Sequence, residues 1–263
     1  MEATSISSSQ RDNDPLSDPV AESRRLIDIF TRKNVVARLL GGVAIYLQAP
    51  AEGPILPRDV KDIDIATRRG ARGAATDILL AAGYVPDRMF NALHGARRLL
   101  FYDEGNARKL DVFVGDFSMC HQIPIADRLE REPLTIPLAE LLLTKLQIIE
   151  LTERDQRDIY NLTYHHPMSD GGGPGIEANY IAEVCARDWG LWRTTRSTLE
   201  RCRTDLGGHG LDAAACERID KHLAQLWQRI DAAPKTGKWK LRNRVGDRVR
   251  WYEEPEEHPQ QGR

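Results

Sequence analysis

The segment Val60-Lys61-Asp62-Ile63-Asp64-Ile65 carries two acids in a run where charged and β-branched residues alternate. Such an alternation predicts a β-strand. Side chains at positions i and i+2 of a strand point to the same face, so Asp62 and Asp64 are expected to lie side by side. Two carboxylates so close repel each other unless a cation lies between them, and oxygen ligands of this kind suit Mg²⁺.

A third acid lies in a similar setting further along the chain. Asp111 interrupts the apolar, strand-like run Lys109-Leu110-Asp111-Val112-Phe113-Val114. If this strand pairs with the strand of Asp62 and Asp64, three carboxylates converge on one patch. Such a patch can hold two hard cations together with the phosphates of a nucleotide.

A glycine pair precedes these acids. Gly41 and Gly42 follow the strand-like run 35–40 and open an apolar, helix-like run that ends at Gln48. Backbone N–H groups at a glycine-rich turn from a strand into a helix can bind phosphate, and the helix dipole assists them.

The ordered set of a glycine pair, two acids separated by one apolar residue, and a later acid among apolar residues resembles the nucleotidyltransferase superfamily of DNA polymerase β-like enzymes. Within it, the chain is most similar to the AbiE-type bacterial toxins and their relatives. The resemblance spans Gly41 to Asp111. It implies an α+β fold, with a nucleotidyltransferase-like mixed β-sheet and flanking helices, followed by a C-terminal helical bundle.

The same resemblance implies Mg²⁺-dependent transfer of an NMP group from an NTP to an acceptor hydroxyl, with release of pyrophosphate. Asp62 and Asp64 would bridge two Mg²⁺ ions, and Asp111 would help to bind the second ion. Gly41 and Gly42 would offer their N–H groups to the phosphates. In relatives, acceptors are tRNA 3′ ends, protein side chains or small molecules.

Two basic residues complete the implied site. AbiE-type relatives have an arginine and a threonine before the paired acids; Arg58 matches the arginine, but Val60 stands in the place of the threonine. From the residues alone, Arg58 is equally well explained as a solvated loop arginine. Lys145 is nearly the only cation in an apolar helix predicted over 138–151, and such a lysine either extends to water or serves a site. The resemblance implies that Lys145 contacts the triphosphate, and leaves open whether Asp158 only braces the basic residues.

The patterning divides the chain into four parts. Residues 1–18 are Ser-rich and acidic, which predicts a disordered tail. The catalytic domain is predicted over 19–135 and a helical domain over 136–233. Their expected helices are 19–33, 41–48, 72–82, 138–151, 176–186, 188–206 and 211–233, and their expected strands are 35–40, 60–65, 84–90, 97–102 and 108–114. A glycine-rich linker is expected at 168–175.

The last part, 234–263, interleaves lysines and arginines with Trp239, Trp251 and Tyr252. Basic residues with stackable aromatic rings are what RNA binding would use, so this segment slightly favours RNA, such as tRNA, as the acceptor. The alternative is a charged segment that packs back on the bundle with Trp239 buried.

Composition bounds the class of protein. The 263 residues are 41% hydrophobic and 29% charged, as in soluble globular proteins. The four cysteines form no C-x-x-C pair, so reduced thiols are expected and neither a zinc ribbon nor a redox motif is supported. The N-terminal residues do not resemble a signal peptide, and no apolar run approaches the ~18 residues of a membrane span. We therefore predict a cytoplasmic protein without a membrane partner.

Several alternatives stay open. Cys120 and His121 could form a nucleophile pair or a structural contact, and Asp103 and Asp116 are expected to be loop acids without a ligand role. A non-catalytic nucleotide- or RNA-binding protein could have kept the same fold, or Asp62-Ile63-Asp64 could be a chance motif in another α/β protein. A toxin role would require an antitoxin-like partner, which this one sequence does not show.

Overall fold

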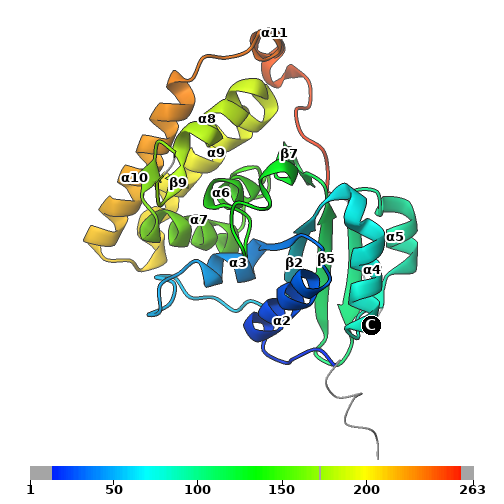
Figure 1. The fold of residues 1–263 in the computed structure, drawn as a ribbon. Coiled ribbons are helices and arrows are strands. Elements are labelled where there is room, and N and C mark those ends of the chain that lie inside the picture. The colour runs from blue at the N-terminus through cyan, green and yellow to red at the C-terminus, as the bar shows by residue number, and fades with distance from the viewer. Residues whose placement is uncertain (1–13, 172, 256–263) are drawn as a thin grey trace, which may run out of the picture.

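The computed structural model describes residues 14–171 and 173–255. Its α+β architecture confirms the prediction of a mixed β-sheet combined with helices (Figure 1). A five-stranded sheet has the order β1-β2-β5-β4-β3. The central pair β2–β5 is parallel, and its neighbours β1–β2, β4–β5 and β3–β4 are antiparallel. The strands are β1 (Ala37–Leu40), β2 (Ile63–Thr67), β3 (Val85–Pro86), β4 (Arg98–Asp103) and β5 (Arg108–Val114).

The N-terminal helices flank this sheet, and each begins at a residue suited to it. Asp18 caps the first helix by accepting a 2.7 Å hydrogen bond from the backbone N–H of Ala21. The predicted strand over 84–90 is wrong beyond Pro86, because Asp87 caps a short helix through the N–H of Phe90. The helices are α2 (Pro19–Arg32), α3 (Gly41–Leu47), α4 (Arg72–Ala81) and α5 (Arg88–His94).

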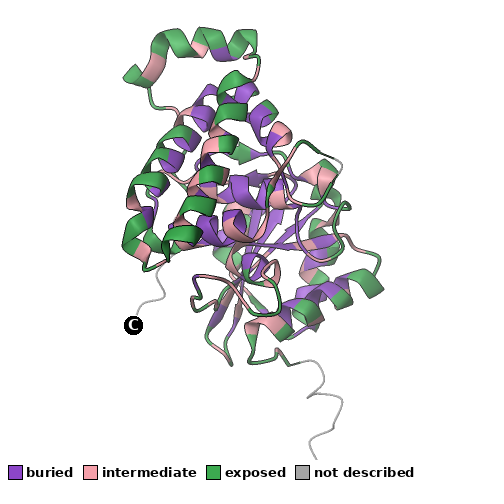
Figure 2. Cartoon of the chain, turned by 90° about the vertical axis from the view of Figure 1, so that its left-hand side faces the viewer, coloured by how far each residue is buried: buried purple, intermediate pink, exposed green. Residues whose placement is uncertain are grey.

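A helical bundle lies beside the sheet, and its helices turn their buried faces inward (Figure 2). The predicted helix 138–151 is wrong in its second half: the helix ends at Leu146, and Thr152 starts the next helix through a capping box with Asp155. Helices α6 to α10 are α6 (Leu138–Leu146), α7 (Glu153–His165), α8 (Ala178–Arg187), α9 (Trp189–Asp205) and α10 (Ala213–Ala232).

Short strands join these helices. The expected glycine-rich linker contains β8 (Met168–Ser169), which pairs in parallel with β9 (Ile176–Glu177) and so closes the loop between α7 and α8. A small hairpin of β6 (Phe117–Ser118) and β7 (Gln122–Ile123) follows β5. Within residues 14–171 and 173–255, every helix is too short or too polar to span a lipid bilayer.

The basic C-terminal segment folds back onto the bundle instead of extending into solvent. Thr236 caps α11 (Gly237–Val245), and Trp239 is buried with its ring 5.1 Å from that of Trp192. The burial of Trp239 agrees with the alternative in which the segment packs back on the bundle, and RNA contact by the segment stays a prediction. Residues 256–263 of this segment lie outside the described part of the chain.

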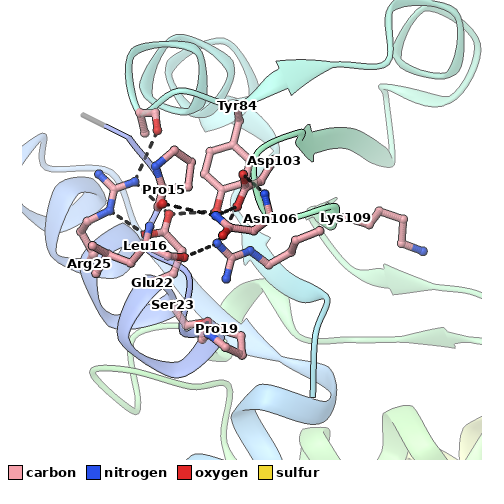
Figure 3. A network of polar contacts seen from close by, with 12 residues as sticks. Pro15, Leu16, Pro19, Glu22, Ser23, Arg25, Tyr84, Asp103, Asn106 and Lys109 are labelled. Atoms are coloured by element: carbon pink, nitrogen blue, oxygen red, sulfur yellow. Dashed lines mark hydrogen bonds and ion pairs between the residues drawn. The ribbon is translucent and has the colours of Figure 1, made fainter. Parts of the chain in front are cut away.

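A buried polar network fastens the chain before α2 to the sheet (Figure 3). The Glu22 carboxylate is fully buried and accepts hydrogen bonds from Arg25 at 2.7 Å and from the Tyr84 hydroxyl at 2.8 Å. The backbone N–H of Leu16 donates to the same carboxylate at 2.9 Å, and Arg108 donates to the Leu16 carbonyl. Part of the predicted disordered tail is therefore held in place, while residues 1–13 lie outside the described chain.

Figure 3 also shows Lys109 pointing away from this network, as the alternation of side chains along β5 requires. Arg108 faces α2, whereas Lys109 and Asp111 face the side of the sheet next to α6. This second face carries the candidate site.

Candidate active site

Asp64 and Asp111 are direct partners on the two parallel strands β2 and β5. Neighbouring strands lie about 4.8 Å apart, so the two carboxylates share one face at short range. Asp111 is 1% exposed and Asp64 is half-buried. Burial, and next the negative charge of Asp111, raise the pKa of Asp64 to about 7, against the opposing effect of Lys145, Lys109 and Arg98.

Asp62 lies at the edge of this pair. The predicted strand 60–65 in fact begins at Ile63, so Asp62 belongs to the preceding loop and is exposed. Its Oδ1 atom accepts a hydrogen bond of 3.2 Å from the backbone N–H of Lys109. This bond fastens the loop to β5 and directs one carboxylate oxygen of Asp62 toward the backbone.

All three acids line one cavity of about 330 Å³. The sheet forms its floor, and α6 with the loop that follows contributes Thr144, Lys145, Gln147 and Ile148 to its wall. The lining also includes three cations, so that the acids and the cations are equal in number. The cations are Arg98, Lys109 and Lys145. A cavity of this size and charge suits a polar, phosphate-bearing ligand.

Two of these cations hold Asp111. The Nε atom of Arg98 lies 2.8 Å from its Oδ1 atom, and the Nζ atom of Lys109 lies 3.3 Å from its Oδ2 atom. Sequence reasoning missed both residues. Lys109 could have been found, because it lies two positions before Asp111 on the same strand face. Arg98 could not, because its place depends on the antiparallel register of β4 with β5.

The glycine pair gives Asp64 and Arg58 room to approach the backbone. Gly41 has φ +68°, a conformation that favours glycine, and a Cβ atom on it would lie 2.0 Å from the Oδ2 atom of Asp64. A Cβ atom on Gly42 would lie 2.2 Å from the Nη2 atom of Arg58. The start of α3 is thus in contact with both an acid and a base predicted for the site.

Arg58 and Lys145, which are 87 positions apart in the printed sequence, meet at Asp158. The carboxylate of Asp158 accepts hydrogen bonds from the Nε and Nη2 atoms of Arg58 at 2.8 and 2.7 Å. It also lies 2.9 Å from the Nζ atom of Lys145. Lys145 also contacts Asp155 at 3.0 Å. Burial by itself would lower the pKa of Lys145, but the two acids outweigh burial and raise it. Asp158 therefore braces both basic residues, which was one of the open alternatives.

Arg58 is less directly placed than Lys145. It lines two pockets beside the central cavity, of which one also contains Gly42 and Asp158. Lys145 lines the central cavity itself. The structure thus brings together Gly41, Asp62, Asp64, Asp111 and Lys145, and sets Gly42 and Arg58 next to them.

The donor set fits a hard cation at Asp64 and Asp111. Both ligands are oxygen atoms, and the charge of Asp111 is, after burial, the second cause of the raised pKa of Asp64. Repulsion between two carboxylates is the kind that a bound cation relieves. Asp62 is turned toward the backbone of Lys109. Among the described residues, no group of three or more His, Cys, Asp or Glu side chains is arranged to hold a metal ion.

The other polar candidates have structural roles. Cys120 and His121 are buried, and the Nε2 atom of His121 lies 2.8 Å from the Thr194 hydroxyl. Asp103 pairs with Arg108 at 2.6 Å, and Asp116 accepts backbone N–H groups of the loop after β7. The four cysteines are free thiols, as expected.

Comparison with known proteins assigns no family: no family model matches the chain, and no curated protein matches it. The side chains of the cavity are therefore the basis for inferring what the protein does. They offer a carboxylate pair, an ammonium group held by two acids, and a glycine turn that lies close against Asp64.

Proposed function

We propose that the protein is a Mg²⁺-dependent nucleotidyltransferase that moves an NMP group from an NTP to an acceptor hydroxyl. The observation that carries this proposal is the pairing of Asp64 with Asp111 in a cavity that Lys145 also lines. Asp64 and Asp111, with Asp62 beside them, would hold Mg²⁺. When bound, Mg²⁺ would offset the charge of the phosphates and acidify the acceptor hydroxyl.

The proposed reaction is an in-line displacement at phosphorus. The oxygen of the acceptor hydroxyl forms a bond to the α-phosphorus of the NTP, and the bond from that phosphorus to the oxygen bridging to the β-phosphate breaks. Pyrophosphate leaves with that oxygen. The hydroxyl proton passes to the carboxylate pair of Asp64 and Asp111 and from there to water. Such a reaction depends on positioning and charge more than on covalent chemistry by the protein.

The basic residues would stabilise the negative charge of the leaving pyrophosphate. Lys145 is held by Asp155 and Asp158, so its ammonium group is positioned before the charge on pyrophosphate develops. Arg58 shares Asp158 with Lys145 and lies against Gly42, at the turn where backbone N–H groups would meet the β- and γ-phosphates. Arg98 and Lys109 fix the orientation of Asp111.

One observation favours a second candidate function, a nucleotide-binding protein without catalysis. Both oxygens of Asp111 already contact a cation, and Asp62 is hydrogen-bonded to the backbone. A cavity with charges balanced in this way could bind a nucleotide without a metal ion. This candidate predicts NTP binding that does not change when Mg²⁺ is removed, and no transfer of label.

A label-transfer assay tests the proposal. The protein is incubated with Mg²⁺ and each α-labelled NTP in turn, together with total RNA and a cell lysate. Label is expected in one acceptor fraction, and Asp64→Asn is expected to reduce it by roughly 100-fold or more. Asp77→Asn, which changes an exposed acid on α4, is the matched control and should transfer like wild type. Equal transfer by Asp64→Asn and wild type would refute the proposal.

A further inference from the structure

A second pocket adjoins the candidate active site. It has a volume of about 270 Å³ and lies between α9 and the loop that connects α6 with α7. Ile148, Ile149 and Leu151 of that loop give it an apolar floor. Ile148 lines both this pocket and the cavity of Asp64 and Asp111, so the two spaces share a wall residue. A molecule in the second pocket would therefore contact a residue that also lines the cavity of the acids.

An indole ring forms part of this pocket's wall. Trp251 is half-buried, and its Nε1 atom donates a 3.0 Å hydrogen bond to the hydroxyl of Thr194. Its ring meets that of Trp189 edge-on at a centroid distance of 6.1 Å. Two residues further, the N–H of Glu253 donates to the Cys120 carbonyl at 3.0 Å. The ring is thus held in place beside the pocket, unlike the side chain of a loose tail.

Two arginines of α9 line the same pocket. The Nε atom of Arg193 contacts Asp247 at 3.2 Å, and its guanidinium lies 5.5 Å from the Trp251 ring centroid. Arg201 contacts Asp205 at 3.5 Å, and its side chain is 55% exposed. Arg193 also donates to the Ser197 hydroxyl, so most of its donors are already engaged within the protein. Arg201 is more exposed and has five N–H donors in a planar fork, more than Asp205 can accept. The pocket therefore offers donors for a second anion.

We propose that this pocket binds the acceptor substrate and that the acceptor is a nucleotide. The inference rests on the proposed nucleotidyl transfer and adds the substrate class. A base would lie on the apolar floor beside Trp251, and its phosphate would contact Arg193 and Arg201. Its sugar hydroxyl would then face Ile148 and the acids beyond it. A cationic small molecule is disfavoured, because both charged groups lining the pocket are arginines.

A free nucleotide and the end of an RNA chain share this chemistry, so the test uses both as probes. Binding of a 5′-fluorescein-labelled RNA hexamer is measured by anisotropy, with and without AMP as competitor. Displacement by AMP assigns the pocket to a free nucleotide, and binding of the hexamer without displacement assigns it to an RNA end. Binding of Mg²⁺–ATP is measured separately by calorimetry on each variant.

Arg201→Glu is the informative variant, and Arg196→Glu is its matched control. Both arginines are exposed on α9 and both pair with an acid four residues later, but only Arg201 lines the pocket. Arg201→Glu should weaken hexamer or AMP binding by about tenfold or more, and Arg196→Glu by less than about threefold. Neither variant should change binding of Mg²⁺–ATP.

The outcomes separate this proposal from the one it rests on. If both variants weaken probe binding equally, the probes bind by general electrostatic attraction, and the proposed role of the pocket is refuted. Wild-type binding of both probes by Arg201→Glu, while the protein still binds Mg²⁺–ATP and transfers label, would overturn the pocket alone. Binding of a probe that depends on Arg201, without binding of any of the four Mg²⁺–NTPs, would support the pocket and overturn nucleotidyl transfer.

Discussion

The Oδ2 atom of Asp64 lies 2.0 Å from the point that a Cβ atom on Gly41 would occupy. No side chain fits between the turn and the carboxylate, so the conformation of Gly41 and the position of Asp64 depend on each other. The turn thereby links the start of α3 to the central strand of the sheet.

Gly41→Ala should therefore disrupt the site and lower stability. The new methyl group would displace Asp64, and an alanine at φ +68° adds strain of about 1–2 kcal/mol. Gly73→Ala is the control, because it lies in α4 with nothing within 4 Å of its added Cβ atom. That change should raise the free energy of unfolding by about 0.4–1 kcal/mol. Urea unfolding measures the stability of each variant, and titration with Mg²⁺–ATP measures the site. Unchanged Mg²⁺–ATP binding by Gly41→Ala would contradict the predicted disruption of the site.

Asp158→Ala should be strongly destabilising, because it leaves Arg58 and Lys145 partly buried without their shared acid. Removing one partner of a buried ion pair costs about 3–5 kcal/mol. The exposed pair of Glu183 with Arg187 provides the control, and Glu183→Ala should change the free energy of unfolding by less than about 1 kcal/mol. Similar costs for the two variants would show that Asp158 does not brace the basic residues.

His121 should make the protein less stable in acid. Burial is the main cause that lowers the pKa of His121 to about 4, against the opposing effect of Asp188. The unfolded value is about 6.5, so between these two values the unfolded chain binds a proton that the folded protein does not. Stability contributed by neutral His121 is therefore lost as the pH falls from about 6.5 toward 4.

The loss attributable to His121 should reach about 2–3 kcal/mol near pH 4.5. His121→Gln removes the titrating group and keeps a polar side chain next to Thr194. The difference in unfolding free energy between wild type and this variant should shift by that amount between pH 7 and pH 4.5. A difference that stays constant across this range would contradict the buried, neutral state of His121.

Trp239→Ala should show that the basic C-terminal segment belongs to the folded domain. Trp239 is 8% exposed and packs against Trp192, so its loss should cost about 3–5 kcal/mol. Leu241→Ser, on the same helix but 63% exposed, should stay within about 0.5 kcal/mol of wild type. A cost near zero for Trp239→Ala would mean that the segment is detached in solution.

Much of the sheet could be predicted from the sequence, because its strands follow a regular alternation. The strand 108–114 has the predicted bounds, and side-chain alternation allows Asp64 and Asp111 to share a face once β2 and β5 are neighbours, whereas their direct pairing also depends on the register. The break after Leu146 was not visible, because apolar residues continue through Leu151 and are partly or fully buried in the loop as well.

The cations around Asp111 show where sequence reasoning ends. Arg98 reaches Asp111 only through the register of β4 with β5, which no local pattern specifies. The shift of Asp62 into the loop likewise depends on a backbone contact with Lys109. Both are tertiary effects, and both change how many carboxylates are available to a metal ion.

The most direct test of the central claim is the Mg²⁺ dependence of ATP binding, because it does not require the acceptor. Calorimetry on wild type, Asp64→Asn and Asp77→Asn would be carried out with Mg²⁺ and with EDTA. We predict that wild type and Asp77→Asn bind ATP with Mg²⁺ and bind it at least about tenfold more weakly in EDTA, whereas Asp64→Asn loses this dependence. ATP binding that is equal with Mg²⁺ and with EDTA in all three proteins would contradict the claim.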